Sequence, residues 1–105
     1  MIAVIFEVKP KNDSKEVYCS KARELRKYLK NINGFISVER FQSLNNPDNF
    51  LSLSFWRDEQ AVQSWKRQNQ HREAQKLGRV SFFDHYRIQI ATVIKDYDIH
   101  RADDQ

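Results

Sequence analysis

The chain is 105 residues long, 40% hydrophobic and 30% charged, with a formal net charge of +4. This length fits one domain with a single core and leaves no room for a second domain. Lysine and arginine are interspersed with aspartate and glutamate, which argues against a nucleic-acid-binding arm or a polybasic membrane patch. The single cysteine, Cys19, excludes an internal disulfide and a metal site built from several cysteines.

The beginning of the chain has the pattern of a strand. Residues 2–8 are almost continuously apolar and rich in β-branched side chains, as in a strand covered on both faces. No basic leader precedes them, and no stretch approaches the ~20 apolar residues that cross a bilayer. We therefore expect a cytoplasmic protein without a membrane partner.

The next segment has the pattern of an amphipathic helix. Asp13 and Glu16 have the spacing of a capping box, so the helix is expected to begin near Ser14. Gly34 is expected to end it in a left-handed conformation, and Cys19 falls off the apolar face, which predicts an exposed thiol. The apolar stripe consists of Val17, Tyr18, Ala22, Leu25, Tyr28, Leu29 and Ile32.

Two strands follow, joined by a long turn. Residues 35–41 alternate in hydrophobicity, the sequence QSLNNPDN at 42–49 is typical of a turn, and residues 50–56 form the second strand. Asp58 is placed to cap a second helix. This arrangement predicts a hairpin followed directly by a helix.

The last strand is expected from about residue 83 to 94, with Tyr86 among its mostly apolar even positions. The resulting order β-α-β-β-α-β predicts an α+β, ferredoxin-like sandwich over residues 1–97, with an antiparallel sheet and both helices on one face. Residues 98–105 are expected to form a flexible tail. The apolar face left bare predicts a homodimer joined face to face.

The sequence SWKRQNQHREAQKLGR, residues 64–79, is the strongest candidate for carrying chemistry. Residues 61–77 contain two sets of apolar side chains that point in different directions on a helical wheel. One set is Ala61, Val62 and Trp65, and the other is Ala74 and Leu77. We therefore expect a break near residues 68–70, where Asn69 is a candidate N-cap. His71 would lie in the first turn of a second short helix that Gly78 closes.

Such a break would open a cavity between helix and sheet, with Trp65 on its inner wall and His71 at its mouth. The free N–H groups at the start of a short helix favour a neutral imidazole and attract anions. Structural roles remain open alternatives, with Trp65 as a core aromatic residue and His71 as a capping histidine.

Four segments resemble the antibiotic biosynthesis monooxygenase family of dimeric α+β barrels. They are AVIFEVKP, NGFISVERFQS, SLSFWRDEQAVQSWKRQNQHREAQKLGR and FFDHYRIQIATV, and the resemblance covers about residues 2–97. The pattern Trp56, Trp65, His71, Gln75, Gly78 and Arg79 resembles the branch related to polyketide-biosynthesis monooxygenases. The resemblance implies a homodimer with one cavity per subunit, between sheet and helices.

The resemblance also implies an activity, that of a cofactor-independent monooxygenase acting on a small aromatic or polyketide-like substrate of quinol or anthrone type. Deprotonation makes such a substrate electron-rich enough to react with dioxygen directly. His71 is the expected base, because a reference pKa of about 6.5 suits proton abstraction from an acidic phenol near neutrality. The other expected contacts are a hydrogen bond from Tyr86, stacking by Trp56 and Trp65, and charge balance by Arg72 or Arg79.

Other functions compete with this one. A non-catalytic, dimeric ligand-binding or stress-response protein needs the same apolar pocket. Haem-degrading relatives carry an asparagine on the first strand, and no asparagine precedes Asn12, so haem is not the favoured cofactor. No metal is expected, because the histidines at 71, 85 and 100 lack ligand spacing. An RNA-binding domain shares the element order but needs a glycine- and aromatic-rich third strand.

Overall fold

The computed structural model describes residues 1–75 and 83–100, without the side chains of residues 14, 21, 69–75 and 83. The elements are β1 (Ile2–Pro10), the 3-10 turn η1 (Asn12–Ser14), α1 (Lys15–Leu29), β2 (Phe35–Gln42), β3 (Phe50–Trp56), α2 (Glu59–Gln75) and β4 (Phe83–Thr92). This order confirms the predicted β-α-β-β-α-β arrangement. Within the described ranges, none of the helices is long and apolar enough to span a membrane.

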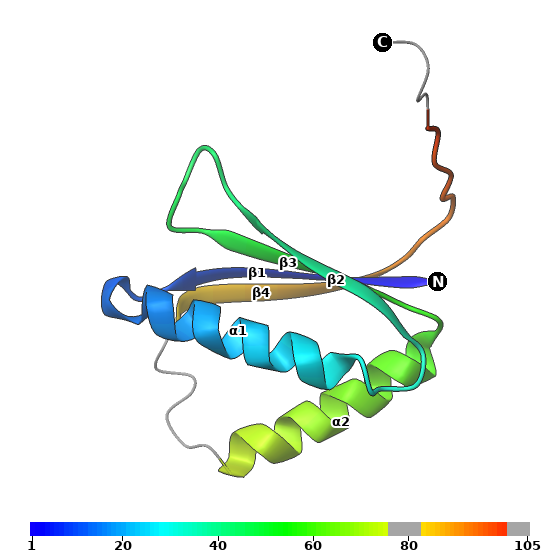
Figure 1. The fold of residues 1–105 in the computed structure, drawn as a ribbon, viewed down its shortest axis with the longest axis horizontal. Coiled ribbons are helices and arrows are strands. Elements are labelled where there is room, and N and C mark those ends of the chain that lie inside the picture. The colour runs from blue at the N-terminus through cyan, green and yellow to red at the C-terminus, as the bar shows by residue number, and fades with distance from the viewer. Residues whose placement is uncertain (76–82, 101–105) are drawn as a thin grey trace.

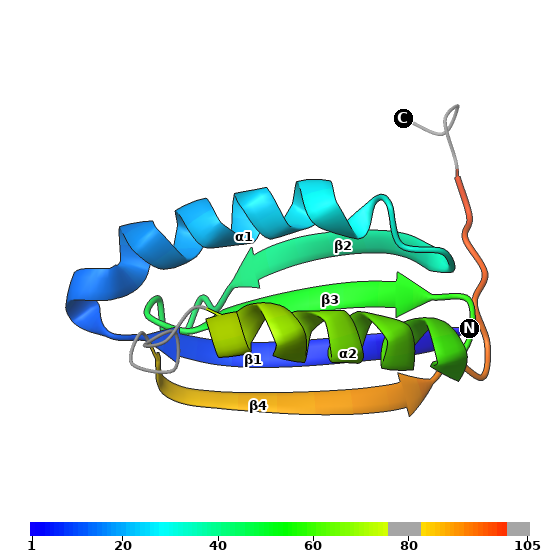
Figure 2. The same ribbon diagram turned by 90° about the horizontal axis from the view of Figure 1, so that it is seen from below.

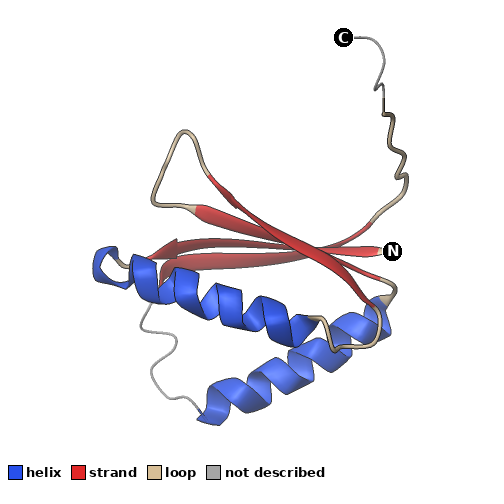
Figure 3. Ribbon diagram, viewed as in Figure 1, coloured by secondary structure: helices blue, strands red, loops and turns tan. Residues whose placement is uncertain are grey.

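The strands form one antiparallel sheet in the order β2-β3-β1-β4, in which β1 pairs with both β3 and β4. Both helices cover the same face of the sheet, and the opposite face is open (Figures 1 and 3). The fold is therefore the expected α+β, ferredoxin-like sandwich. The strands β2 and β4 are its two edges.

α1 is shorter than the sequence pattern predicts. The turn η1 precedes it, the helix begins at Lys15, and it ends at Leu29 rather than near Ile32. Ile32 is nevertheless buried, because the loop after α1 folds back onto the core. Gly34 has the predicted left-handed conformation, with φ 91°. A Cβ at this position would lie 2.5 Å from Cβ of Ala61, so glycine also allows the loop to approach α2 closely.

The core lies between the sheet and the two helices. Its buried members are Ile2, Val4, Leu29, Ile32, Trp56, Ala61 and Val62. Asp58 fixes the start of α2 as predicted, because its Oδ1 accepts a hydrogen bond from the backbone N–H of Ala61 at 2.9 Å. The cap places the first turn of α2 directly on this core.

The open face of the sheet is also largely apolar. The register pairs Ala3 with Phe55 and Ile5 with Leu53, which puts these side chains on the face away from the helices. An ion pair between Glu7 and Arg87, at 3.2 Å, lies on the same face.

Candidate functional site

Part of the helix-covered face stays exposed along β4. The register sets Tyr86, Ile88 and Ile90 opposite Val8, Phe6 and Val4, which places them on the face that carries the core. Tyr86, Ile88 and Ile90 are nevertheless 51%, 46% and 47% exposed. Figure 2 shows the reason, since α2 lies over β1 and β3 and leaves β4 beyond its edge. We call these three residues the β4 strip.

One aromatic contact joins this strip to β1. The rings of Phe6 and Tyr86 are tilted against each other with centroids 6.0 Å apart. On α2, Trp65 packs against the core cluster that contains Val4, the cross-strand neighbour of Ile90. The indole of Trp65 and the β4 strip therefore lie on the same face of the sheet.

The two tryptophans belong to one aromatic stack but differ in their polar contacts. Their ring centroids are 5.5 Å apart, and Phe35 meets Trp56 edge-on at 5.3 Å. Trp56 donates its Nε1–H to Oγ of Ser54 at 2.9 Å. The Nε1–H of Trp65 is buried and has no hydrogen-bond partner within the described part of the chain. A buried donor of this kind needs an explanation, and a ligand acceptor is one.

The helix α2 is continuous from Glu59 to Gln75, so the predicted break near residues 68–70 is wrong. Apart from Asn69 and His71, residues 66–75 are lysine, arginine, glutamine, glutamate and alanine. These are strong helix formers, and the stretch has no glycine or proline, so the helix continues without burying a second apolar group. No helix terminus exists at residue 71, so the dipole argument for a neutral His71 no longer applies. Gly78, the predicted end, lies outside the described residues.

The continuous helix also changes which positions share a direction with Trp65. Position 72 follows two turns later and returns to within about 20° of it, whereas position 71 lies about 120° away. The side chains of His71 and Arg72 are outside the described part of the structure, as is the whole of Arg79. Their roles therefore remain predictions.

The two described residues of the predicted site besides Trp65 have different surroundings. Tyr86 lies on the apolar, helix-side face of β4, as the alternation of the last strand predicted, and it is half exposed there, whereas Arg87 is on the opposite face. Trp56 has no exposed surface and belongs to the core. The prediction that Trp56 stacks on a ligand is therefore wrong. Trp56 instead packs against the ring of Trp65 from the core side.

A second polar cluster, which the sequence analysis did not anticipate, lies between α1 and β2. The guanidinium of Arg40 is 4.9 Å from the ring centroid of Tyr18 and 5.9 Å from that of Phe50. It also donates to Sγ of Cys19 at 3.6 Å, so this thiol is part-buried rather than exposed as predicted. Burial raises the pKa of the Tyr18 phenol, and the nearby Arg40 charge partly opposes this.

Alternation along β2 was the available signal for Arg40, since it shares the helix-side face with Val38. The cluster is packed and lacks the exposed apolar lining of the β4 strip. Among the described residues, no group of three or more histidine, cysteine, aspartate or glutamate side chains is placed to hold a metal ion. The Trp65 indole and the β4 strip together are therefore the better candidate site.

Comparison with known proteins gives both a family and a relative. The family model for antibiotic biosynthesis monooxygenase matches residues 1–77. The chain is 41% identical over 93 residues to a Pyricularia oryzae protein named jasmonate monooxygenase ABM. The alignment covers 89% of the chain but 43% of the relative, so the chain spans less than half the length of this relative.

Solved structures share the fold. A conserved protein from Methanosarcina mazei is similar with a TM-score of 0.74 and 22% identity, covering 86% of the chain and 89% of that protein. A mutant of MhuD, which has two manganese protoporphyrin IX molecules bound per active site, has a TM-score of 0.72 and 13% identity, covering 93% of the chain and 99% of MhuD. At these identities the similarity establishes the fold alone.

Proposed function

Because this chain belongs to the antibiotic biosynthesis monooxygenase family, we propose that it is a monooxygenase acting on a small aromatic substrate of quinol or anthrone type. The substrate loses a proton to give an electron-rich anion, which adds to dioxygen to form a hydroperoxide that then loses water. For an anthrone, the CH₂ group and O₂ give a carbonyl group and one molecule of water. The atoms and electrons balance without a cofactor, so none is part of the proposal.

The observation that supports this proposal most is the buried, unpaired Nε1–H of Trp65, on the face of the sheet that also carries the exposed β4 strip. A flat ring lying on the β4 strip meets Ile88 and Ile90 with its face. An oxygen atom on that ring can accept the hydrogen bond that Trp65 has to give. Leaving such a buried donor unpaired costs roughly 1–3 kcal/mol, and a ligand acceptor recovers it.

Other residues are assigned roles within the same proposal. Tyr86 hydrogen-bonds the substrate oxygen from the strip, and His71 remains the proposed base because it is the imidazole nearest to Trp65 along α2. Arg72 is the preferred partner for a developing oxyanion, since its helix position returns to the direction of Trp65. Arg79 is the second choice for this charge.

A second candidate substrate comes from the relative at 41% identity, whose name assigns jasmonate to that protein. Jasmonate is a cyclopentanone carboxylic acid, and a cation at position 72 suits its carboxylate. Inserting one oxygen atom into such a molecule consumes two electrons and two protons besides O₂. The assay for this substrate therefore needs a reductant of the nicotinamide or flavin type.

Haem is not favoured as a partner of this site. The side chains that β1 presents toward the helices are those of Ile2, Val4, Phe6 and Val8. None of these four side chains is polar, so β1 gives no hydrogen-bonding or ligating group to a porphyrin bound on this face. A non-catalytic binding protein remains the competing alternative, because the same strip and indole bind an aromatic ligand without turnover.

The test is oxygen consumption by the purified protein with an anthrone, a quinol and jasmonate, the last with and without a reductant. We expect uptake with an anthrone or quinol alone, with one atom of ¹⁸O₂ in the product. His71→Ala and Tyr86→Phe should each lower kcat at least tenfold, while Leu44→Ala, at a 98% exposed loop position, should leave it unchanged. Tight binding with no uptake from any substrate refutes the enzyme, and a Soret shift on added haem identifies the porphyrin alternative.

The proposal includes a homodimer joined through the open face of the sheet. This face holds Ala3, Ile5, Leu53 and Phe55 on its central strands. Ile5, Leu53 and Phe55 are half-buried in the single subunit, and the helices cover the opposite face. Apolar faces of this extent usually mark protein interfaces. Two sheets stacked about 10 Å apart bury it and leave the helix-side site of each subunit accessible.

A further inference from the structure

Two side-chain nitrogens are buried without a hydrogen-bond partner in the described part of the chain, Nε1 of Trp65 and Nε of Arg40. The first belongs to the proposed site. The second is on β2, where Arg40 lies opposite Ser52 of β3, and Ser52 lies opposite Phe6 of β1. Phe6 in turn lies opposite Ile88 of the β4 strip. These side chains thus form one row across the helix-side face of the sheet.

Arg40 is a cation without an anion to pair with. Cζ of its guanidinium lies 4.9 and 5.9 Å from the ring centroids of Tyr18 and Phe50, and Nη2 donates to Sγ of Cys19 at 3.6 Å. Within the described ranges, no aspartate or glutamate forms an ion pair with it. Cations that are withdrawn from water are normally paired with an anion. The half-buried Arg40 can therefore bind an anion that the described chain does not supply.

The row between β2 and β4 keeps exposed surface. On the helix-side face of β1, Val4 and Val8 are each 2% exposed, whereas Phe6 between them is only half-buried. Ser52, its neighbour on β3, is half-buried too. Figure 1 shows α2 moving away from the sheet toward its C-terminal end, in agreement with this incomplete cover. A ligand on the β4 strip can therefore extend over Phe6 toward β2.

The spacing of the strands sets the size of such a ligand. Arg40 and Phe6 are two strands apart, or about 10 Å at the usual distance between strands. A ring that stacks on Phe6 thus needs an acid group roughly 10 Å away to reach the guanidinium. A carboxylate suits this position best, because the forked N–H groups of arginine match the two carboxylate oxygens.

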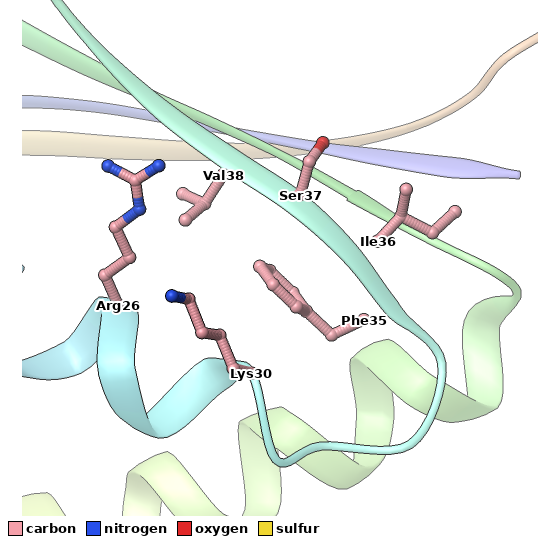
Figure 4. Close-up of a pocket in the computed structure, with 6 residues that line it drawn as sticks. All are labelled: Arg26, Lys30, Phe35, Ile36, Ser37 and Val38. Atoms are coloured by element: carbon pink, nitrogen blue, oxygen red, sulfur yellow. The ribbon is translucent and has the colours of Figure 1, made fainter.

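A second pair of cations is the alternative position for an acid group. Figure 4 shows Arg26 and Lys30 extending from α1 toward Phe35 and Val38, around a groove of about 360 Å³. Both cations are exposed, so their charges are solvated and screened by salt. Within the described structure, neither has a buried nitrogen that lacks an acceptor. We therefore expect this groove to bind anions more weakly than Arg40 does.

We propose that Arg40 forms the acid-binding end of the site, and that the ligand is a ring compound with a carboxylate on a chain. The ring lies on Phe6 and the β4 strip, an oxygen on it accepts the hydrogen bond of Trp65, and the carboxylate binds the guanidinium of Arg40. The inference rests on the proposed function. Among aromatic substrates it favours those that carry an acid group, so Arg40 determines specificity and takes no part in the chemistry.

The test compares ω-phenylhexanoate, whose acid group lies at about the required distance from its ring, with its uncharged methyl ester. In calorimetric titrations the wild type should bind the acid at least tenfold more tightly than the ester. Arg40→Gln should bring the two affinities within threefold of each other, whereas Arg40→Lys should keep most of the preference because it keeps the charge. Arg26→Gln, the matched control in the groove of Figure 4, should keep the full preference.

Cys19 reports on the same contact in the wild type, where folding is not in question. Its Sγ lies 3.6 Å from Nη2 of Arg40, and it is the single cysteine of the chain. Saturating ω-phenylhexanoate should therefore change the rate of Cys19 alkylation by iodoacetamide at least twofold, and the ester should not. An unchanged rate with the bound acid overturns the contact with Arg40.

The remaining outcomes separate this inference from the proposed function. Equal binding of acid and ester by the wild type, or binding of neither, overturns the acid-binding end. A preference that persists in Arg40→Gln but is lost in Arg26→Gln or Arg72→Gln gives the acid group to another cation and overturns the role of Arg40. An equal preference for phenylacetate over its ester puts the acid group beside the ring and does the same. Oxygen uptake with an anthrone decides the proposed function separately, because an anthrone has no carboxylate.

Discussion

Trp56 and Trp65 stack with ring centroids 5.5 Å apart, yet Trp56 alone of the two has its indole nitrogen hydrogen-bonded within the described structure. Trp56 has no exposed surface, and its bond to Ser54 completes the core. Trp65 stacks on Trp56, and its Nε1–H is left as a donor for a ligand. The pair thus divides into a structural tryptophan and a candidate binding tryptophan.

Replacing Trp65 by phenylalanine tests the binding role. The change keeps an aromatic ring on Trp56 but removes the N–H, so ligand affinity should fall roughly tenfold, the equivalent of about 1.4 kcal/mol. The stability of the ligand-free protein should change little, because the lost donor had no partner. Calorimetric titration with an anthrone-type ligand measures the affinity, and urea unfolding measures the stability. Unchanged affinity would mean that the indole nitrogen contacts no ligand.

Trp56→Phe should have the opposite profile. It loses the hydrogen bond to Ser54 and leaves a cavity in the core, which together cost about 2–4 kcal/mol of unfolding free energy. Ligand affinity of the folded fraction should change by less than threefold, since the side chain is fully covered. The urea midpoint measures the loss of stability. A variant as stable as the wild type would remove Trp56 from its structural role.

The sequence predicted the sheet, the helices and the hairpin because each depends on local patterns. Alternation along β4 placed Tyr86 correctly, and Asp58 was recognised as a cap. The break in α2 was predicted wrongly because a wheel assumes that every apolar group must be buried, whereas Ala74 and the polar residues before it have high helix propensity. The sequence also could not show that Trp56 is buried beneath the ring of Trp65, because that contact depends on how α2 crosses the sheet.

Gly34→Ala tests the close approach of the loop before β2 to α2. A side chain at φ 91° is strained, and its Cβ would lie 2.5 Å from Cβ of Ala61, so we expect a loss of about 2–4 kcal/mol. The double variant Gly34→Ala/Ala61→Gly removes the overlap but keeps the strained φ. Gly34→Ala should therefore cost less free energy of unfolding in the Ala61→Gly background than in the wild type. Chemical denaturation measures both costs. No coupling between the two changes would show that the loop moves away freely.

Asp58 should make stability depend on pH in the acid range. The backbone N–H of Ala61, and then the guanidinium of Arg57, hold the pKa of this carboxyl below its usual 3.8. A carboxyl whose pKa is lowered by folding stabilises the protein above its unfolded pKa, and this contribution is lost as the pH falls through the folded pKa. Asn caps a helix without titrating, so the stability difference between wild type and Asp58→Asn should shrink below pH 3.8.

Asp48→Asn provides a comparison for this acid dependence. Asp48 lies on the loop between β2 and β3, and Lys15 lowers its pKa, but it does not cap α2. Its removal therefore reports the acid dependence of an ion pair without a helix cap. Thermal unfolding from neutral pH into the acid range compares the variants. If Asp58→Asn and the wild type differ equally at every pH, the carboxylate charge adds nothing to the cap.

Leu53→Asp tests the open face of the sheet as a dimer interface. Leu53 lies at the middle of β3, opposite Ile5 and next to Glu39 on β2, so a carboxylate there puts a second negative charge within an apolar interface. Burying an unpaired charge costs several kcal/mol, so the carboxylate opposes association through this face. Light scattering coupled to gel filtration should therefore show the monomer mass for this variant and twice that mass for the wild type. Leu44→Asp, at a 98% exposed position on the loop between β2 and β3, is the matched control and should stay dimeric. If Leu53→Asp remains a folded dimer, the subunits associate through another surface.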